Sequence, residues 1–126
     1  MDFPQNLKYT EDHEWIKIDG NIGTIGITEH AQGELGDIVY VDIPDQNANL
    51  NQGDSFGTIE AVKTVAELFS PISGKIIEVN APLNDAPETV NTDPYGNGWI
   101  VKVELSNLAE VDGLMDAEAY KSHIGK

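Results

Sequence analysis

Hydrophobic and β-branched residues occur along the chain in short runs separated by turn residues, and this pattern predicts a fold built mainly from β-strands. Two such runs flank Asp19-Gly20-Asn21, whose residue types tolerate a tight turn, so residues 13–28 are expected to form a hairpin. Further strands are expected at 38–43, on both sides of residue 63, at 75–79 and at 99–105. Many short strands with turns between them are typical of a small all-β sandwich or flattened barrel.

Alternation within two of these strands predicts which side chains lie on the same face. One face of the strand at 38–43 is expected to hold Val39, Val41 and Ile43. The strand at 99–105 alternates most regularly, and the side chains expected to face the core are those of Trp99, Val101, Val103 and Leu105. Ile100 is expected on the opposite face of that strand.

Two short helices are expected. Thr28 is a capping residue and Gly36 a terminating one, so one or two helical turns should lie between them. Residues 116–125 begin with an aspartate and end with Lys, His and Gly, which is typical of a short helix. This helix is expected to pack through Met115, Ala119 and Tyr120. Residues 46–53 are expected to form a surface loop, and residues 80–98 an ordered or semi-ordered connection without strands.

The length and composition suit one domain spanning residues 1–126, because 40% hydrophobic residues are enough for a single core in 126 residues. The chain has no cysteine, which excludes disulfides, thiolate metal ligands and a cysteine nucleophile. No apolar run approaches the roughly 20 residues that span a bilayer, and the N-terminus lacks the features of a signal or transit peptide. We therefore expect a cytoplasmic protein, with a processed form in an organellar matrix as the alternative.

The charge of the chain narrows its possible partners. Seven lysines, no arginine and 22 acidic residues give a formal net charge of −15. Such a surface repels phosphate backbones and anionic lipids, so neither nucleic acid nor a membrane is an expected partner. The acidity either docks the protein on basic patches of partner enzymes or keeps it in solution. Without the bidentate clamp that arginine provides, a phosphate-binding enzyme is not expected.

Lys63 lies between small and β-branched residues in the middle of a predicted hairpin. Pro71 and Ser73-Gly74 end the second arm of this hairpin, because proline cannot donate to a β-ladder and Ser-Gly marks a turn. The turn of a hairpin lies at the edge of a molecule, so the lysine side chain should point into water. We interpret Lys63 as a modified lysine at a hairpin tip, and the alternative is an ordinary solvated lysine.

Five segments of the chain resemble one protein family. The first combines Glu-Ala-Val-Lys at 60–63 with Ser-Pro-Ile-Ser-Gly-Lys-Ile-Ile-Glu-Val-Asn at 70–80. The other four lie at 9–15, 26–32, 35–41 and 91–99. Together they make nearly the whole chain resemble the H protein of the glycine cleavage system. The resemblance implies a mainly β barrel-sandwich hybrid, the flattened β-barrel of lipoyl and biotinyl domains, with a short helix after the first hairpin and a C-terminal helix.

The resemblance also implies a function. Lys63 would carry lipoate in amide linkage, with a reach on the order of 10 Å, and no residue of the chain would be catalytic. The protein would carry an aminomethyl group from a pyridoxal-phosphate glycine decarboxylase (P protein) to a tetrahydrofolate-dependent aminomethyltransferase (T protein). A flavin dihydrolipoyl dehydrogenase (L protein) would reoxidise the arm, and a lipoate-attaching enzyme is the fourth implied partner.

The roles of several other residues are implied only by this resemblance. Asp12, Glu14 and Glu67 match positions that contact the loaded arm in the family, and their carboxylates would pair with a protonated amine. Glu60 and Glu67 are candidates for recognition by the lipoate-attaching enzyme. The family often has a histidine at the position of Glu34. For His13 and His30 we expect structural or surface roles and no metal site, because no third histidine lies nearby in the sequence.

Four alternative functions are weighed against the carrier. A relay protein of the same fold would hand lipoate on to other acceptor domains, and the sequence does not separate it from the carrier. A biotinyl carrier would resemble Met-Lys-Met at the attachment point, whereas Val62 and Thr64 flank Lys63. An unmodified β-sandwich would only bind a partner protein. An independent enzyme is disfavoured, because the chain lacks a cysteine nucleophile, a glycine-rich phosphate loop and a nucleophile elbow.

Overall fold

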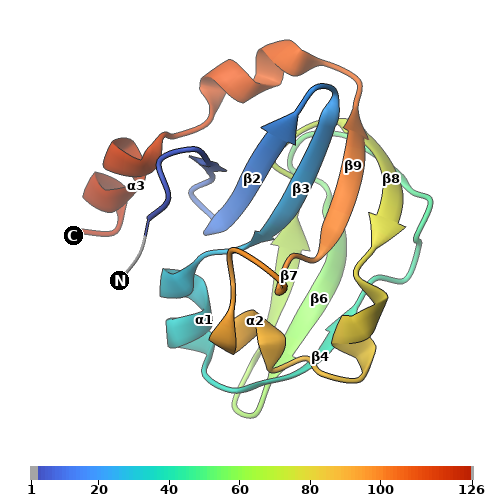
Figure 1. Cartoon of the computed structure of the whole chain (residues 1–126), viewed down its shortest axis with the longest axis vertical. Helices are drawn as coiled ribbons and strands as arrows, with labels where there is room; N and C mark the ends of the chain where they lie inside the picture. The colour runs from blue at the N-terminus through green and yellow to red at the C-terminus, as the bar shows by residue number, and fades with distance from the viewer. Residues whose placement is uncertain (1–2, 126) are drawn as a thin grey trace.

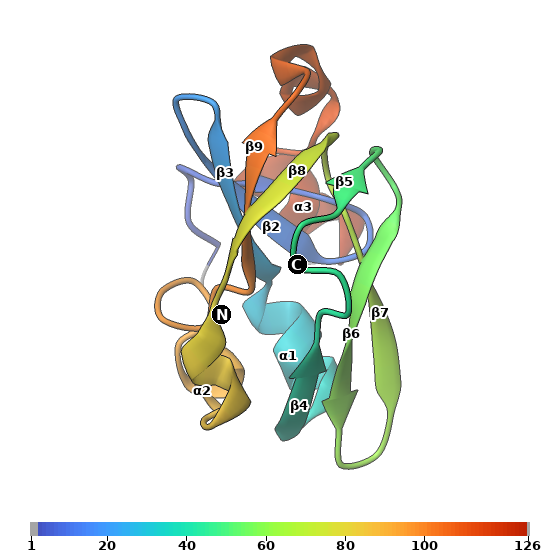
Figure 2. The ribbon, with the colours of Figure 1, turned by 90° about the vertical axis from the view of Figure 1, so that its right-hand side faces the viewer.

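The computed structural model of the chain describes residues 3–125 and consists of two antiparallel β-sheets that face each other across a hydrophobic core (Figure 1). The order in the larger sheet is β1 (Lys8–Tyr9), β2 (Glu14–Asp19), β3 (Ile22–Ile27), β9 (Val101–Leu105), β8 (Gly74–Val79) and β5 (Asn49–Leu50). The order in the smaller sheet is β4 (Ile38–Asp42), β6 (Ser55–Ala61) and β7 (Val65–Phe69). Figure 2 shows β8 and β9 on one side of the molecule and β6 and β7 on the other. The predicted fold class, a mainly β flattened barrel-sandwich, is confirmed.

The first hairpin and the helix that follows it form where the sequence predicts them. β2 and β3 pair along their whole length, and Gly20 occupies the turn with a φ of 63°, which favours glycine. The helix α1 (Glu29–Leu35) begins after Thr28, whose hydroxyl accepts a hydrogen bond from the backbone N–H of Ala31. Gly36 ends the helix with a φ of 83°.

The core has a main part between the sheets and a second part under the C-terminal helix α3 (Ala117–His123). In the second part the rings of Tyr9 and Tyr120 stack with their centroids 4.8 Å apart, and Met115 packs against them as expected. The expectation for Ala119 is wrong, because its side chain is exposed. Ala117 is buried instead, since it lies three positions before Tyr120 and shares its face of the helix.

The strand β4 does not alternate as predicted. Val41 and Ile43 are buried, but Val39 is 49% exposed and does not share their face. The pairing of β4 with β6 shifts register between Ile38 and Tyr40, which marks a β-bulge. The bulge inserts one residue into the alternation and leaves both Val39 and Tyr40 on the outside.

The last core strand begins later than predicted. The buried side chains of β9 are, as expected, Val101, Val103 and Leu105. Ile100, however, is 1% exposed and belongs to the main core, whereas Trp99 is half-buried and packs against the second core cluster. The backbone N–H of Trp99 donates to the carbonyl of Gly96, so this residue still belongs to the preceding turn and not to the alternating strand.

The two irregular segments differ in how well they were predicted. The segment at 46–53 contains the two-residue strand β5, because Leu50 is buried and Asn49 pairs with Lys75 of β8, so the expectation of a plain loop is wrong. The connection at 80–98 has no strand, as expected, and contains the 3-10 helix η1 (Ala81–Asn84) and the helix α2 (Thr89–Thr92). A further 3-10 helix, η2 (Leu108–Gly113), precedes α3. No helix within residues 3–125 is long and apolar enough to cross a membrane.

Candidate functional site

Lys63 lies in the turn of the hairpin formed by β6 and β7. The two strands pair up to Glu60 opposite Val65, and the backbone N–H of Ala61 donates to the carbonyl of Thr64 at 2.8 Å. The side chain of Lys63 is exposed, and this turn forms one end of the molecule in Figure 2. The predicted hairpin with an exposed lysine at its tip is therefore present in the structure.

A cavity of about 130 Å³ lies between this hairpin, α1 and the turn that precedes β2. Its aliphatic wall is formed by Ile27, Ala31, Leu35, Ile59, Ala66 and Leu68. Its polar lining consists of Asp12, His13, Glu14, Glu34 and Glu67. Asp12 and Glu67 are exposed at the rim, whereas Glu14 is buried. The fold thus places the three acidic residues predicted to contact the arm around one cavity, with Glu14 buried and the other two at its exposed edge.

Glu14 is the one buried carboxylate among them, with 2% of its surface exposed. Its carboxylate accepts hydrogen bonds from the hydroxyl of Thr10 at 2.6 Å and from the backbone N–H of Phe69 at 3.2 Å, so it ties the turn before β2 to the end of β7. Burial raises the pKa of Glu14 to about 7, although both hydrogen bonds act to lower it. The carboxyl group therefore changes charge near neutral pH.

Glu60 and Glu67 were also predicted to be recognised by the lipoate-attaching enzyme, and both lie on the β6–β7 hairpin. Glu60 lies opposite Val65, and Thr58 lies opposite Glu67, so both glutamates project from the same face of the hairpin. Val62 and Val65 beside the lysine are 69% and 59% exposed. A role for Glu60 and Glu67 in recognition stays a prediction, and the structure places both within a few residues of Lys63.

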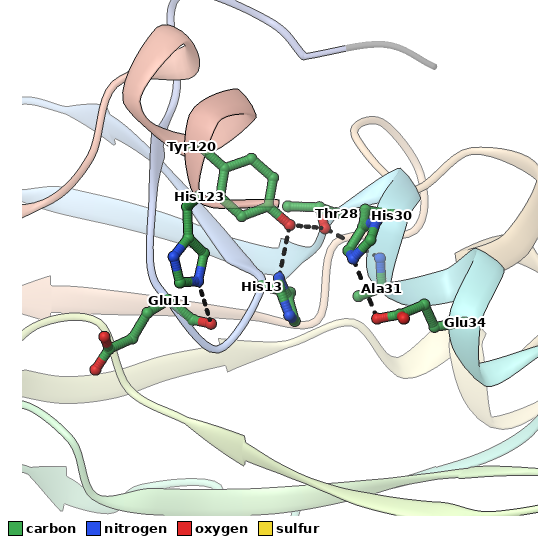
Figure 3. Close-up of polar contacts among 8 residues, drawn as sticks. All are labelled: Glu11, His13, Thr28, His30, Ala31, Glu34, Tyr120 and His123. Atoms are coloured by element: carbon green, nitrogen blue, oxygen red, sulfur yellow. Dashed lines mark hydrogen bonds and ion pairs between the residues drawn. The ribbon is translucent and has the colours of Figure 1, made fainter. Parts of the chain in front are cut away.

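The structure also groups residues that sequence reasoning kept apart (Figure 3). One ring nitrogen each of His13 and His30 and a carboxylate oxygen of Glu34 lie within 4.8 Å of one another. His13 Nδ1 is also 2.9 Å from the hydroxyl of Tyr120, which is 2.8 Å from that of Thr28. The spacing of His30 and Glu34 on one helical face was visible in the sequence, whereas the approach of His13 and Tyr120 depends on the tertiary fold.

Three comparisons with known proteins agree with one another. The model of a family described as "Glycine cleavage H-protein" matches residues 7–126. The chain is similar to a glycine cleavage system H protein of Staphylococcus haemolyticus (strain JCSC1435), with 54% identity over 126 residues that cover 100% of both proteins. It is also similar to the crystal structure of a glycine cleavage system H protein from Mycobacterium marinum. That match has a TM-score of 0.90 and 39% identity, and it covers 98% of this chain and 100% of the other.

Proposed function

The chain belongs to the glycine cleavage H-protein family, and on this premise we propose that it is the lipoylated shuttle of the glycine cleavage system. Lys63 is the proposed site of covalent lipoylation. The protein would carry the aminomethyl group of glycine from the P protein to the T protein, would be reoxidised by the L protein, and would itself be non-catalytic. The observation that carries this proposal is the exposed Lys63 at the end of the β6–β7 hairpin, beside a cavity rimmed with carboxylates.

The surroundings of Lys63 fit a covalently attached lipoyl group. No ion pair of Lys63 is found among residues 3–125, so its amine is available for acylation. The turn is also anchored, because the backbone N–H of Val62 donates to the carbonyl of Asp37 at 3.1 Å. Because the turn is anchored, the exposed amine of Lys63 would be held at a fixed position where an attaching enzyme can reach it.

The cavity fits the far end of such an arm. Glu67 follows Lys63 by four positions, so its Cα lies at most about 13 Å away at roughly 3.3 Å per residue. This distance is similar to the reach expected of the arm. The aliphatic wall suits a methylene chain, because apolar surface is covered when the chain lies against it. When bound, lipoate supplies the dithiol and disulfide chemistry that a chain without cysteine lacks.

We assign the binding of the carried amine to Asp12, Glu14 and Glu67. A protonated amine in the cavity would meet the buried carboxylate of Glu14, with Asp12 and Glu67 at the exposed rim. Charge-assisted hydrogen bonds of this kind are strongest where water is excluded, which favours the buried Glu14. Because its pKa is about 7, Glu14 can hold a proton on its carboxylate in the empty cavity and release it when a cation arrives.

Apolar side chains near the lysine support the docking of partner enzymes at this end of the molecule. Val62, Val65 and Tyr40 are all at least 45% exposed, and Tyr40 lies opposite Glu60 in the smaller sheet. Exposed apolar groups are typical of contact surfaces when they cluster. We propose that the P, T and L proteins and the lipoate-attaching enzyme approach Lys63 over these side chains, with Glu60 and Glu67 as acidic contacts.

Mass spectrometry of the intact protein with peptide mapping tests the attachment. Protein made in cells supplied with lipoate should carry one lipoyl group on Lys63. The variant Lys63→Arg should carry none, and the matched control Lys75→Arg, which alters another exposed lysine, should be modified like the wild type. An unmodified Lys63 in cells with active lipoylation would overturn the proposal.

A second assay separates the shuttle from a lipoyl relay. The lipoylated protein should support glycine decarboxylation when it is combined with the P, T and L proteins. A relay would instead transfer its lipoyl group to an acceptor domain, which the same mass analysis of the acceptor detects. Lipoyl transfer without support of glycine decarboxylation would replace the shuttle by the relay.

A further inference from the structure

A cluster of two histidines and one glutamate lies at the rim of the cavity, outside the roles assigned so far. His13 precedes β2, and His30 and Glu34 lie one helical turn apart on α1. His30 Nε2 is 3.1 Å from a carboxylate oxygen of Glu34, and the rings of the two histidines have centroids 4.9 Å apart. Figure 3 shows His13 and Glu34 on either side of the His30 ring, from two elements that meet at this point.

The backbone of His13 is fixed in an uncommon conformation. Its φ is 70°, and His13 is the one non-glycine residue among residues 3–125 with a positive φ. Its N–H donates to the carbonyl of Thr10, and its carbonyl accepts from the N–H of Thr28. Residues held in the left-handed region cluster at functional sites, where surrounding contacts maintain a side-chain direction that a relaxed backbone would not give.

The ring of His13 is oriented by a second layer of hydrogen bonds. Nδ1 contacts the hydroxyl of Tyr120 at 2.9 Å, and that hydroxyl contacts the buried hydroxyl of Thr28 at 2.8 Å. Binding of an ion at Nε2 uses the tautomer in which Nδ1–H donates to Tyr120 and Tyr120 donates to Thr28, whose oxygen also accepts from the backbone N–H of Ala31. Nε2 of His13 then keeps a free lone pair. Histidines that bind metals are held in this manner, with one nitrogen on a partner oxygen and the other on the ion.

The cluster is accessible from solvent. Glu34 is exposed and His30 is half-buried, so an ion can enter from solvent.

From this geometry we propose that His13, His30 and Glu34 bind one divalent transition-metal ion of the zinc type, with the remaining coordination positions open to solvent. Two imidazoles and one carboxylate form a donor set that zinc prefers over calcium or magnesium, which favour oxygen ligands alone. His123 is not included, because its Nε2 is already 3.3 Å from the carbonyl of Glu11. Because His13 and Glu34 also line the cavity, the bound ion lies where it controls access to Glu14.

Titration of the full chain with Zn²⁺, followed by calorimetry, and with Co²⁺, followed by its visible absorption, tests the site. The lipoylated protein is used in its disulfide form and without an affinity tag, so that neither thiols nor added histidines bind the ion. One equivalent should bind, and His30→Gln and Glu34→Gln should each weaken binding at least about tenfold. Both residues lie on the surface of a helix, and circular dichroism verifies that the variants are folded.

Two matched controls distinguish the cluster from general attraction to an acidic surface. Glu29→Gln removes the same charge from the same helix but lies outside the cluster, and His123→Gln removes a neighbouring imidazole. Both should bind the ions like the wild type. Absence of binding by one equivalent, equal weakening by Glu29→Gln and Glu34→Gln, or binding that the cluster variants leave unchanged would each overturn the proposal.

Discussion

Replacement of Glu14 by glutamine should remove the part of the pH dependence of stability that this carboxyl group contributes between about pH 4.5 and pH 7. The carboxyl group is 2% exposed and has a pKa of about 7 in the folded protein, compared with an ordinary value of 4.5. Glutamine has the same shape and keeps a carbonyl oxygen for the backbone N–H of Phe69. The variant therefore removes the titration and retains the packing.

The sign and size follow from the two pKa values. The folded state binds the proton of Glu14 more tightly than the unfolded state does, so its contribution to stability is fully present below pH 4.5 and is lost as pH rises through 7. The difference between 4.5 and about 7 corresponds to at most about 3 kcal/mol, at 1.36 kcal/mol for each unit. In the glutamine variant this loss is absent.

Urea unfolding at pH 5 and pH 8, in the presence of a chelator, measures the effect. The free energy of unfolding of the wild type should fall between the two pH values by about 2–3 kcal/mol more than that of Glu14→Gln. Other titrating groups, including His13, are common to both proteins and cancel in the difference. Glu11→Gln, which removes an exposed charge nearby, serves as the control and should behave like the wild type. An equal fall in wild type and Glu14→Gln would refute the assignment of a raised pKa to this carboxyl group.

Three further predictions use other parts of the structure. Gly33→Ala in α1 should raise the free energy of unfolding by about 0.5–1 kcal/mol, because a methyl group there meets no atom within 4 Å. Gly57→Ala should lower the free energy of unfolding, because its methyl group would collide with the backbone oxygen of Asp42. Equal effects of the two substitutions in thermal unfolding would contradict both predictions. Tyr120→Phe should lower the free energy of unfolding in urea by about 1–3 kcal/mol, because His13 and Thr28 each lose a hydrogen bond to the hydroxyl. An unchanged free energy of unfolding would show that these two hydrogen bonds do not stabilise the fold. Glu14→Gln should also speed the loss of the aminomethyl group from the loaded carrier, and an unchanged rate of decay would remove the proposed role of Glu14 in its protection.

Much of the fold was predictable because turns and caps are local. Asp19-Gly20-Asn21 and the pair Thr28 and Gly36 define the first hairpin and α1 through their own backbone preferences. Two of the errors arose where the ladder departs from a strict period of two. The bulge before Tyr40 turned Val39 outward, and the turn at Gly96 delayed the start of β9 and placed Ile100 in the core.

The candidate site was predictable in part. Lys63 followed from its position in a predicted turn and from the resemblance around it, and the resemblance also named the carboxylates that the cavity brings together. The burial of Glu14, which raises its pKa, is a tertiary property, because it arises where the turn before β2 meets the end of β7. The meeting of His13 with His30 and Tyr120 likewise joins three segments that no local pattern relates.

The two sheets also differ in which parts of the chain supply their strands. This difference determines the order in which their contacts can form in a newly synthesised molecule. The smaller sheet is formed within residues 38–69, where the two-residue strand β5 belongs to the other sheet, whereas the larger sheet joins both ends of the chain, with Tyr9 bridged to Met115 and His13 held by Tyr120. Synthesis proceeds from the N-terminus, so the residues of the hairpin with Lys63 are made before those of β9 and α3. The contact that fixes His13 is thus among the last to form.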